Sequence, residues 1–298
     1  MDHVLTLIAP EAGALDDSML GRVRSALLEL GADLLSPSWL SPARAVDLPF
    51  TLLSADQAVA AAKRELAPHP VDVIAQPVRD RRKALLLADM DSTMVTGETL
   101  DELADFAGLK ERIAAITARS MNGEIDFKDA LRERVGLLRG LSADMLEETW
   151  RRVVFTPGGS SLIATMKANG AYTVLVSGGF DFFTGRVRAH CGFDADFSNR
   201  FEIEEGRLTG RVIDPILDRD AKLKTLIETA AARAIPLSRT MTVGDGANDL
   251  DMIRAAGLGV AFHAKPVVAG KASARIDHGD LRSLLYIQGY NDSEIIGD

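Results

Sequence analysis

The chain has 298 residues, of which 47% are hydrophobic and 26% are charged, with a net charge of −9 at pH 7 and one cysteine. This composition is typical of a globular protein with room for two domains, and it excludes an intrachain disulfide and a thiolate metal cluster. The acidic balance argues against broad binding to nucleic acid or to an anionic membrane surface. We expect no signal peptide and no membrane span, because no long apolar run is present, and therefore a cytoplasmic location.

The first 80 residues predict a small domain with the element order βαββαβ. Apolar or alternating runs predict the strands, and apolar residues at helical spacing predict the helices. The strands are expected at residues 3–9, 32–39, 43–52 and 71–75, and the helices at residues 16–30 and 56–66. The order is similar to that of ACT-like, ferredoxin-like domains, and it leaves regulation by amino-acid binding, packing and dimerisation open as roles. We expect residues 1–80 and residues 81–298 to form separate domains. A homodimer is one possible assembly of the chain.

A basic stretch joins the two predicted domains. Residues 78–83 carry four cationic side chains and one acidic side chain. A phosphate-binding patch and a solvated linker would both suit such a run of charges. We favour the linker, since charge runs are usually solvated.

A short buried strand is predicted next, and two carboxylates follow it. The apolar run at residues 84–88 is too short for a helix and is bounded by charge, which is typical of a strand in a parallel sheet. Asp89 and Asp91 lie at its carboxyl end, where open α/β sheets bind ligands, and both would emerge on the same side of an extended chain. Because neighbouring carboxylates repel each other, a divalent cation or a proton-transfer role explains them better than stability does.

Four helices are predicted directly after this strand. Their apolar residues recur at helical spacing in residues 99–107, 111–118, 127–138 and 143–153. We expect these helices to form a cap, at about residues 96–156, that closes over the strand end. The later strands and helices alternate, which predicts a doubly wound parallel sheet, and a hairpin is expected at residues 199–211.

Further polar residues follow later predicted strands or lie on a neighbouring helix. They are Ser177, Gly178 and Gly179, then Lys222, and then Asp245, Asn248 and Asp249. The carboxyl ends of parallel strands meet at one edge of a sheet, so these residues can converge on Asp89 and Asp91.

Phosphoryl transfer is the chemistry that suits this set. A carboxylate such as Asp89 can accept the phosphoryl group as an aspartyl-phosphate, and Asp91 can donate and accept the proton. Mg²⁺ would be needed between phosphate and carboxylates, held by Asp89, Asp245 and the backbone carbonyl of Asp91, with Asp249 orienting its waters. Lys222 and the hydroxyl group of Ser177 would stabilise the charge of the phosphoryl group.

These residues resemble a known superfamily. Residues 89–93 match the DxDx[TV] motif of the haloacid dehalogenase (HAD) superfamily, and Ser177, Lys222 and residues 244–249 match its other three motifs in order. The helical insert is similar to a type-1 cap. The resemblance implies a HAD-like doubly wound parallel sheet with a helical type-1 cap, preceded here by the βαββαβ domain.

Within that superfamily, residues 84–288 resemble the phosphoserine phosphatase family. The resemblance implies Mg²⁺-dependent hydrolysis of O-phospho-L-serine to L-serine and phosphate through an aspartyl-phosphate, the last step of L-serine biosynthesis. It implies that Asp89 is the nucleophile and Asp91 the general acid/base. The implied substrate-binding residues are Glu98 for the ammonium group, Arg134 for the carboxylate, Met121 and Phe127 as apolar cover, and Ser177, Gly178, Gly179, Lys222 and Asn248 around the phosphate.

Two further functions stay open at this point. The chain could be a HAD phosphatase acting on another small phosphomonoester, or a phosphotransferase that passes the phosphoryl group to an alcohol such as homoserine. Met90 replaces the Phe or Val usual in the family, and we expect its side chain to point into the core.

Overall fold

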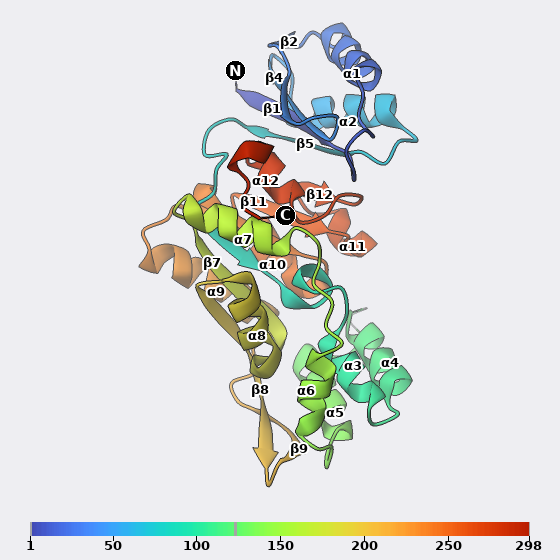
Figure 1. Cartoon of the computed structure of the whole chain (residues 1–298), viewed down its shortest axis with the longest axis vertical. Helices are drawn as coiled ribbons and strands as arrows, with labels where there is room; N and C mark the ends of the chain where they lie inside the picture. Colours follow the sequence, from blue (N-terminus) through green and yellow to red (C-terminus); the bar gives the residue numbers. More distant parts are fainter. Residues whose placement is uncertain (1, 122–123, 298) are drawn as a thin grey trace.

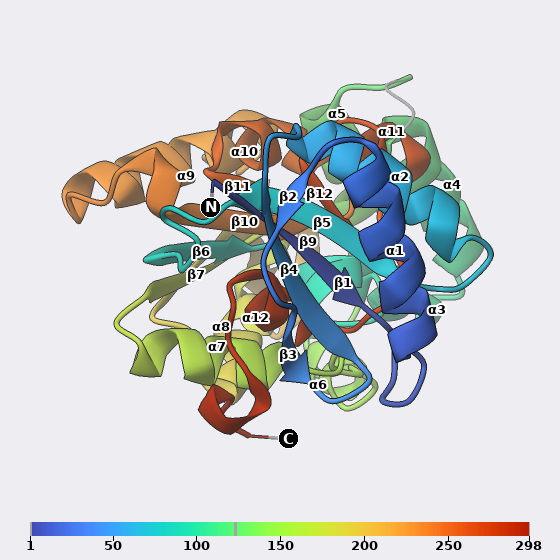
Figure 2. The ribbon, with the colours of Figure 1, turned by 90° about the horizontal axis from the view of Figure 1, so that it is seen from above.

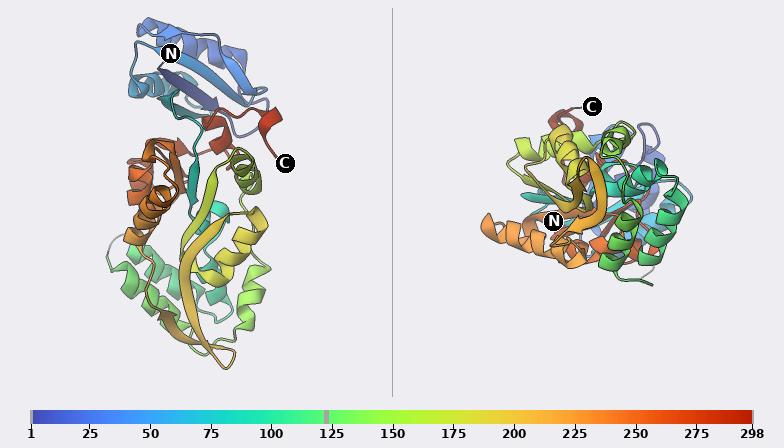
Figure 3. Two further views of the ribbon diagram at one scale, coloured as in Figure 1. Left: turned by 90° about the vertical axis from the view of Figure 1, so that its left-hand side faces the viewer. Right: turned by 90° about the horizontal axis from the view of Figure 1, so that it is seen from below.

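The computed structural model describes residues 2–121 and 124–297 and contains two β-sheets in an elongated molecule (Figure 1). The first sheet is formed by strands of residues 3–77, and the second by strands of residues 85–276. The four cap helices and one hairpin lie at the end of the molecule opposite the first sheet (Figures 1 and 3). The α/β fold predicted from the sequence is thereby confirmed.

The first sheet is antiparallel and carries two helices. Its strand order is β2-β4-β1-β5, and β3 also pairs with β4. The elements are β1 (His3–Ile8), α1 (Asp17–Glu29), β2 (Asp33–Leu34), β3 (Ser38–Ser41), β4 (Ala45–Thr51), α2 (Ala55–Leu66) and β5 (Asp72–Pro77). There is one strand more than predicted, since Pro37, which has no N–H for a strand ladder, lies between β2 and β3. The helices begin where the side chains of Asp16 and Ser54 accept backbone N–H groups.

The second sheet is parallel except for a hairpin at one edge. Its strand order is β12-β11-β10-β6-β7-β8-β9, and only β8 and β9 pair antiparallel. The strands are β6 (Leu85–Ala88), β7 (Tyr172–Phe180), β8 (Ala195–Glu204), β9 (Arg207–Ile213), β10 (Thr240–Gly244), β11 (Leu258–Phe262) and β12 (Ala274–Ile276). The central position of β6, between β10 and β7, explains why its four residues are fully buried.

Helices cover both faces of the second sheet. They are α7 (Gly159–Ala168), α8 (Asp181–Cys191), α9 (Arg219–Ala232), α10 (Leu250–Ala255), α11 (Pro266–Ala269) and α12 (Ser283–Ile287). Side chains of α7, α8 and α12 share one apolar core with the sheet, and side chains of α9 and α10 share another with its opposite face. Leu86 and Ala88 of β6 belong to the first of these cores, and Leu85 and Leu87 belong to the second. This division follows because successive side chains of a strand point to opposite faces of the sheet.

The cap is inserted between β6 and α7. It consists of α3 (Thr99–Asp105), α4 (Lys110–Met121), α5 (Phe127–Leu137) and α6 (Asp144–Trp150), close to the predicted bounds. Apolar residues from α3 to α6 belong to the same core as the sheet, so the cap packs directly on the edge where the strands end.

The first sheet is packed against α12 and β12 and not merely tethered to them. Seen from the end that carries the first sheet, β1 and β4 lie over α12 (Figure 2). The predicted solvated linker at residues 78–83 is wrong in part, because Arg81 and Lys83 are largely buried. Arg81 donates to the backbone carbonyl of Ile287, and Lys83 donates to that of Ser238. The charge composition of residues 78–83 does not indicate these contacts.

Candidate active site

Asp89 is placed at the carboxyl edge of the second sheet by the ladder between β6 and β10. Its backbone N–H donates to the carbonyl of Val243 over 3.0 Å, and 5% of the residue is exposed. Its Oδ1 accepts a hydrogen bond from the N–H of Met90 and lies 2.8 Å from Nζ of Lys222. The side chain of Met90 is fully buried, as expected. The Asp89 carboxylate is therefore held in one orientation by a backbone amide and a buried ammonium group.

The turn after Asp89 directs Asp91 toward the same space. Residues Met90–Met94 form the wide turn η1, in which Asp91 is extended and Ser92 has a left-handed φ of 56°. The N–H of Thr99 donates to Oδ1 of Asp91 over 2.9 Å. A Cβ at Gly179 would lie 3.0 Å from Oδ2 of Asp91, so a side chain at this position would crowd that carboxylate.

Three carboxylates surround one buried lysine. One oxygen each of Asp89, Asp245 and Asp249 lie within 4.8 Å of one another. Lys222, with 1% exposed, reaches Oδ1 of Asp89 at 2.8 Å and Oδ1 of Asp249 at 2.7 Å. The second oxygen of Asp249 accepts the N–H of Gly246 over 3.0 Å. Because a set of hard oxygen donors of this kind suits Mg²⁺, Ca²⁺ or Mn²⁺, the triad could hold a divalent cation.

The electrostatics of the triad are unbalanced without such a cation. Burial, followed by the charge of Asp249, raises the pKa of Asp89 well above its usual value and that of Asp245 to about 7. Burial alone would lower the pKa of Lys222, but the charges of Asp249 and Asp89 outweigh it and raise that pKa. Lys222 thus serves Asp89 and Asp249. Asp245 has, among the described residues, only the distant Lys265 at 3.9 Å, which favours binding of additional positive charge.

Asp91 has the protonation behaviour of an acid/base group. Burial and then the charge of Glu98 raise its pKa to about 7, and the hydrogen bond from the N–H of Thr99 opposes this. A group that titrates near neutral pH can both donate and accept a proton during turnover.

The cap and the sheet edge enclose a small cavity of about 50 Å³. It is lined by Asp89, Asp91, Glu98, Leu100, Phe127, Leu131, Arg134, Ser177, Gly178, Gly179, Phe180, Asp245 and Asn248. Of the predicted site residues, Lys222 and Asp249 do not line the cavity and instead lie next to Asp89. Met121 ends α4, and its side chain lies outside the described residues.

Two of the lining residues have a hydrogen-bonding group left for a ligand, a donor on Ser177 and an acceptor on Asn248. The hydroxyl oxygen of Ser177 accepts the N–H of Gly179 over 2.8 Å, which leaves its own proton free to donate. The Oδ1 atom of Asn248 is buried and has no hydrogen-bond partner among the residues that the structure describes. A Cβ at Gly178 would lie 2.9 Å from the ring of Phe127, so glycine lets the cap ring close on this loop.

Comparison with known proteins agrees with this geometry. The profile of the haloacid dehalogenase-like hydrolases matches residues 86–254. The chain belongs to this hydrolase family. The family predicted from the four motifs is confirmed, as is the enzyme class of hydrolase.

Relatives of this hydrolase include phosphoserine phosphatases. That of Streptomyces coelicolor is 40% identical over 256 residues, which are 85% of this chain and 62% of that protein. That of Albidiferax ferrireducens is 46% identical over 217 residues, 71% of this chain and 92% of the relative. The structure of a HAD family hydrolase from Salmonella enterica serovar Typhi has a TM-score of 0.84 at 29% sequence identity. The match covers 97% of this chain and 98% of the Salmonella chain. The chain thus spans less than two thirds of the Streptomyces relative.

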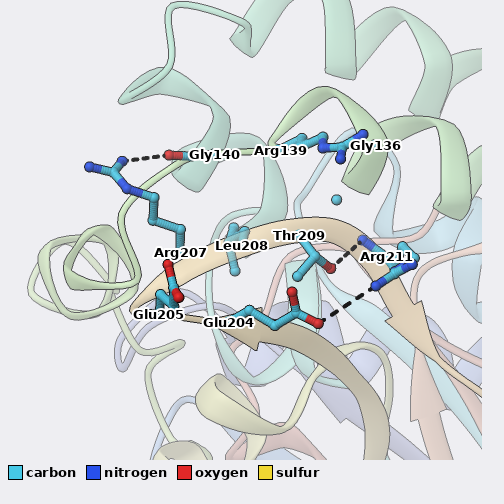
Figure 4. Close-up of a pocket in the computed structure, with 10 residues that line it drawn as sticks. Gly136, Arg139, Gly140, Glu204, Glu205, Arg207, Leu208, Thr209 and Arg211 are labelled. Carbon is cyan, nitrogen blue, oxygen red and sulfur yellow. Dashed lines mark hydrogen bonds and ion pairs between the residues drawn. The ribbon is translucent and has the colours of Figure 1, made fainter.

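A larger cleft of this hydrolase lies away from the acidic cluster. It measures about 820 Å³ and lies between the end of α5 and the β8–β9 hairpin (Figure 4). In this cleft the side chain of Arg207 points to Gly140 and that of Arg211 points to Glu204. None of the predicted site residues lines the cleft.

Among the described residues, no helix is long and apolar enough to cross a membrane.

Sequence reasoning missed three polar residues around Glu98 and Arg134. Ser92 donates to Oε1 of Glu98 over 2.8 Å, Thr117 accepts from Arg134, and Asp101 lies close enough to both charges to respond to them. Burial and then the charge of Glu98 raise the pKa of Asp101 to about 6. An acidic residue in the first turn of a helix is common for local reasons, so the sequence did not single it out.

Proposed function

We propose that this chain is a phosphoserine phosphatase that hydrolyses O-phospho-L-serine to L-serine and phosphate with Mg²⁺. The observation that carries the proposal is the meeting of two groups of side chains in one cavity. Asp89 and Asp245 reach it from the sheet, and Glu98 and Arg134 reach it from the cap. Phosphoryl transfer uses a nucleophile and a metal site, and a zwitterionic amino acid needs one anion and one cation. The names of the relatives from Streptomyces coelicolor and Albidiferax ferrireducens support the same substrate.

The metal site in this proposal is built from the acidic cluster. Oxygens of Asp89 and Asp245 and the backbone carbonyl of Asp91 would hold Mg²⁺, and Asp249 would orient its water molecules. Both oxygens of Asp249 already accept hydrogen bonds, which suits a place one step removed from the ion. When bound, Mg²⁺ would offset the repulsion between phosphate and carboxylates.

The proposed reaction has two steps at Asp89. Its carboxylate oxygen attacks phosphorus, the bond from phosphorus to the serine oxygen breaks, and an aspartyl-phosphate forms. Asp91 gives its proton to the leaving oxygen and then removes a proton from the water that hydrolyses the aspartyl-phosphate. Lys222 and the hydroxyl group of Ser177 stabilise the negative charge that the phosphoryl oxygens carry in both steps.

Substrate recognition in this proposal takes place against the cap. Glu98 pairs with the ammonium group, and Arg134 grips the carboxylate with two hydrogen bonds. Phe127 and Met121 cover the substrate, and the amides of Gly178 and Gly179 and the side chain of Asn248 contact the phosphate. The cavity of about 50 Å³ holds a few water molecules but not a phosphorylated amino acid. The cap therefore has to move away from the sheet edge to admit substrate.

Phosphate release from a panel of phosphorylated amino acids, sugars and alcohols tests the proposal. We expect O-phospho-L-serine to be the preferred substrate, EDTA to abolish turnover, and Asp89→Asn to lower kcat by at least about a thousandfold. Asp105→Asn, at an exposed cap position, serves as the control. Turnover that survives EDTA or Asp89→Asn would reject the mechanism, and preference for another ester or for transfer to homoserine would reject the substrate.

We also propose that residues 1–80 act as a domain distinct from residues 81–298. Regulation by an amino acid and dimerisation both suit a small antiparallel sheet with two helices. Calorimetric titration of the full chain with L-serine and glycine, beside its sedimentation behaviour, separates the two roles. Saturable heat at a site other than the catalytic cavity supports regulation, while a dimer without such heat supports assembly.

A further inference from the structure

Three cap helices meet around the guanidinium group of Arg134. Arg134 is 8% exposed, and its Nε donates to the carbonyl of Ala130 over 3.3 Å within α5. Its Nη1 donates to the hydroxyl oxygen of Thr117 on α4 over 3.1 Å. Its Nη2 has no hydrogen-bond partner among the described residues, and Arg134 lines the catalytic cavity. The guanidinium is thus held from behind, with both protons of Nη2 and one proton of Nη1 left for a ligand.

Asp101, in the first turn of α3, completes this arrangement. Its Oδ1 is shielded from solvent and has no hydrogen-bond partner in the described part of the chain. Its carboxyl group lies beside Thr117, whose hydroxyl oxygen accepts from Nη1 of Arg134 and whose hydroxyl proton is donated to the carbonyl of Ile113 over 3.1 Å. Burial lowers the pKa of Arg134, and the charge of Asp101 is the first to oppose this, ahead of those of Glu98 and Asp91. The charge of Asp101 therefore acts on this buried cation, with which none of the described residues forms an ion pair.

We propose that Asp101 is a positioning residue whose charge keeps the Arg134 guanidinium, held by Thr117, oriented toward the cavity and so sets the preference for phosphate esters that carry a carboxylate. The inference rests on the proposed function, in which Arg134 binds the carboxylate of the substrate. A buried guanidinium without a counter-charge is costly, and the substrate supplies one only while it is bound. Asp101 supplies one in the free enzyme.

A structural role in the helix is the competing explanation for Asp101. Acidic residues in the first turn stabilise a helix through its dipole, and α3 has two of them, Asp101 and Glu102. Glu102 differs in its surroundings, because its side chain lies at the surface and pairs with Lys110 at 2.6 Å. Glu102→Gln therefore removes the same charge from the same helical turn without touching Arg134.

The test compares two esters that differ in the carboxylate alone. O-phospho-L-serine carries an ammonium group and a carboxylate, and O-phosphoethanolamine carries the ammonium group only. For Asp101→Asn in the full chain with Mg²⁺, we expect KM for O-phospho-L-serine to rise about tenfold while kcat falls less than threefold. The inhibition constant of O-phosphoethanolamine, measured by competition so that its turnover is not required, should change less than threefold. An effect of Asp101 on the ammonium subsite would change KM for O-phospho-L-serine and the inhibition constant of O-phosphoethanolamine by the same factor. The ratio of the two constants therefore reports the carboxylate subsite alone.

Two further variants keep the result interpretable. Glu102→Gln should leave both constants within twofold of the wild type, and Thr117→Val should reproduce the selective rise in KM even if Asp101→Asn folds poorly. Equal changes for both molecules, or a selective change in Glu102→Gln, would overturn the positioning role. A wild-type enzyme without activity on O-phospho-L-serine would instead reject the proposed function. Normal wild-type activity with no selectivity change in Asp101→Asn or Thr117→Val would reject this inference alone.

Discussion

At the scale of single residues, the carboxylates that suit the chemistry also work against folding. Asp245 is 7% exposed and lies beside Asp89 and Asp249, with Lys265 at 3.9 Å as a weak counter-charge. Burial and the charge of Asp249 raise its pKa from 3.8 to about 7. The folded protein consequently binds a proton there more tightly than the unfolded chain does. Metal-free stability must fall as that proton is lost, between about pH 4 and pH 7.

Asp245→Asn should remove this dependence on pH. Between pH 5 and pH 8 in EDTA, we expect the variant to lose less unfolding free energy than the wild type by about 1–3 kcal/mol. Urea unfolding at the two pH values measures the difference, and Asp220→Asn, at an exposed position on α9, is the control. Mg²⁺ at pH 8 should stabilise the wild type more than the variant, since the variant has lost one carboxylate of the acidic cluster. Identical pH slopes in EDTA would contradict the buried charge cluster.

The sequence located the residues of the cluster but not the polar residues behind them. Asp89, Ser177 and Asp245 each follow a predicted strand, and the parallel sheet brings those strand ends together. Thr117 and Asp101 lie on cap helices whose relative packing no local pattern specifies. Their relation to Arg134 depends on tertiary contacts and could not be predicted from spacing alone.

At the scale of elements, the cap is joined to the β8–β9 hairpin as well as to the sheet edge. The loop between α5 and α6 exchanges backbone hydrogen bonds with the hairpin, from Gly140 to Leu208, from Leu208 to Leu141 and from Ala143 to Gly206. Figure 4 shows Arg207 of the hairpin bonded to Gly140 of the cap, and Figure 3 shows the two elements side by side. Any motion of the cap must therefore carry the hairpin with it or break these bonds.

Gly210 should be the most sensitive position of this contact. Its φ is 82°, and an added Cβ would lie 2.9 Å from Cβ of Arg139 and 3.3 Å from the carbonyl oxygen of Gly136. Gly206 also has a positive φ, of 73°, but no atom lies within 4 Å of an added Cβ. Both alanine variants carry backbone strain, so we expect Gly210→Ala to be less stable than Gly206→Ala by about 1–2 kcal/mol. Equal midpoints and slopes in urea unfolding of the two variants would show that the cap and hairpin are not in close contact.

Element prediction succeeded where burial makes the pattern strong and failed where the element is short. Residues 84–88 have continuous apolar side chains, residues 240–243 alternate Thr with Met and Val, and both segments form central strands. The edge strand β12 has only three residues with Arg275 in the middle, so no apolar run marks it. Whether a basic run is a linker or a packing element depends on its partners, as Arg81 shows.

At the scale of the whole molecule, Arg81 links the first sheet to α12. Its guanidinium pairs with both oxygens of Asp47 on β4, at 2.6 and 2.7 Å. It also donates to the backbone carbonyls of Ile287 over 2.7 Å and of Tyr286 over 3.2 Å. Asp72 adds a second link, because its carboxylate accepts three backbone N–H groups of residues 277–279. The first sheet and the elements around the second sheet are thus held together by partly buried polar contacts, which leave costly unpaired groups if broken.

Arg81→Ala should destabilise the chain far more than Arg82→Ala, although the residues are adjacent and have the same charge. The Arg81 side chain is 15% exposed, and its loss leaves Asp47, 8% exposed, without its cation, at a cost of about 3–5 kcal/mol. The Arg82 side chain is 44% exposed and pairs with Glu294 near the surface, a contact worth about 0–1 kcal/mol. Urea unfolding measures both values, and Asp47→Asn should lower stability in the same direction as Arg81→Ala.

In the double variant, Arg81→Ala with Asp47→Asn, the loss of stability should be smaller than the sum of the two single losses, since no buried charge then remains unpaired. Additive losses, or equal losses for Arg81→Ala and Arg82→Ala, would mean that the Arg81–Asp47 pair does not hold the first sheet to α12.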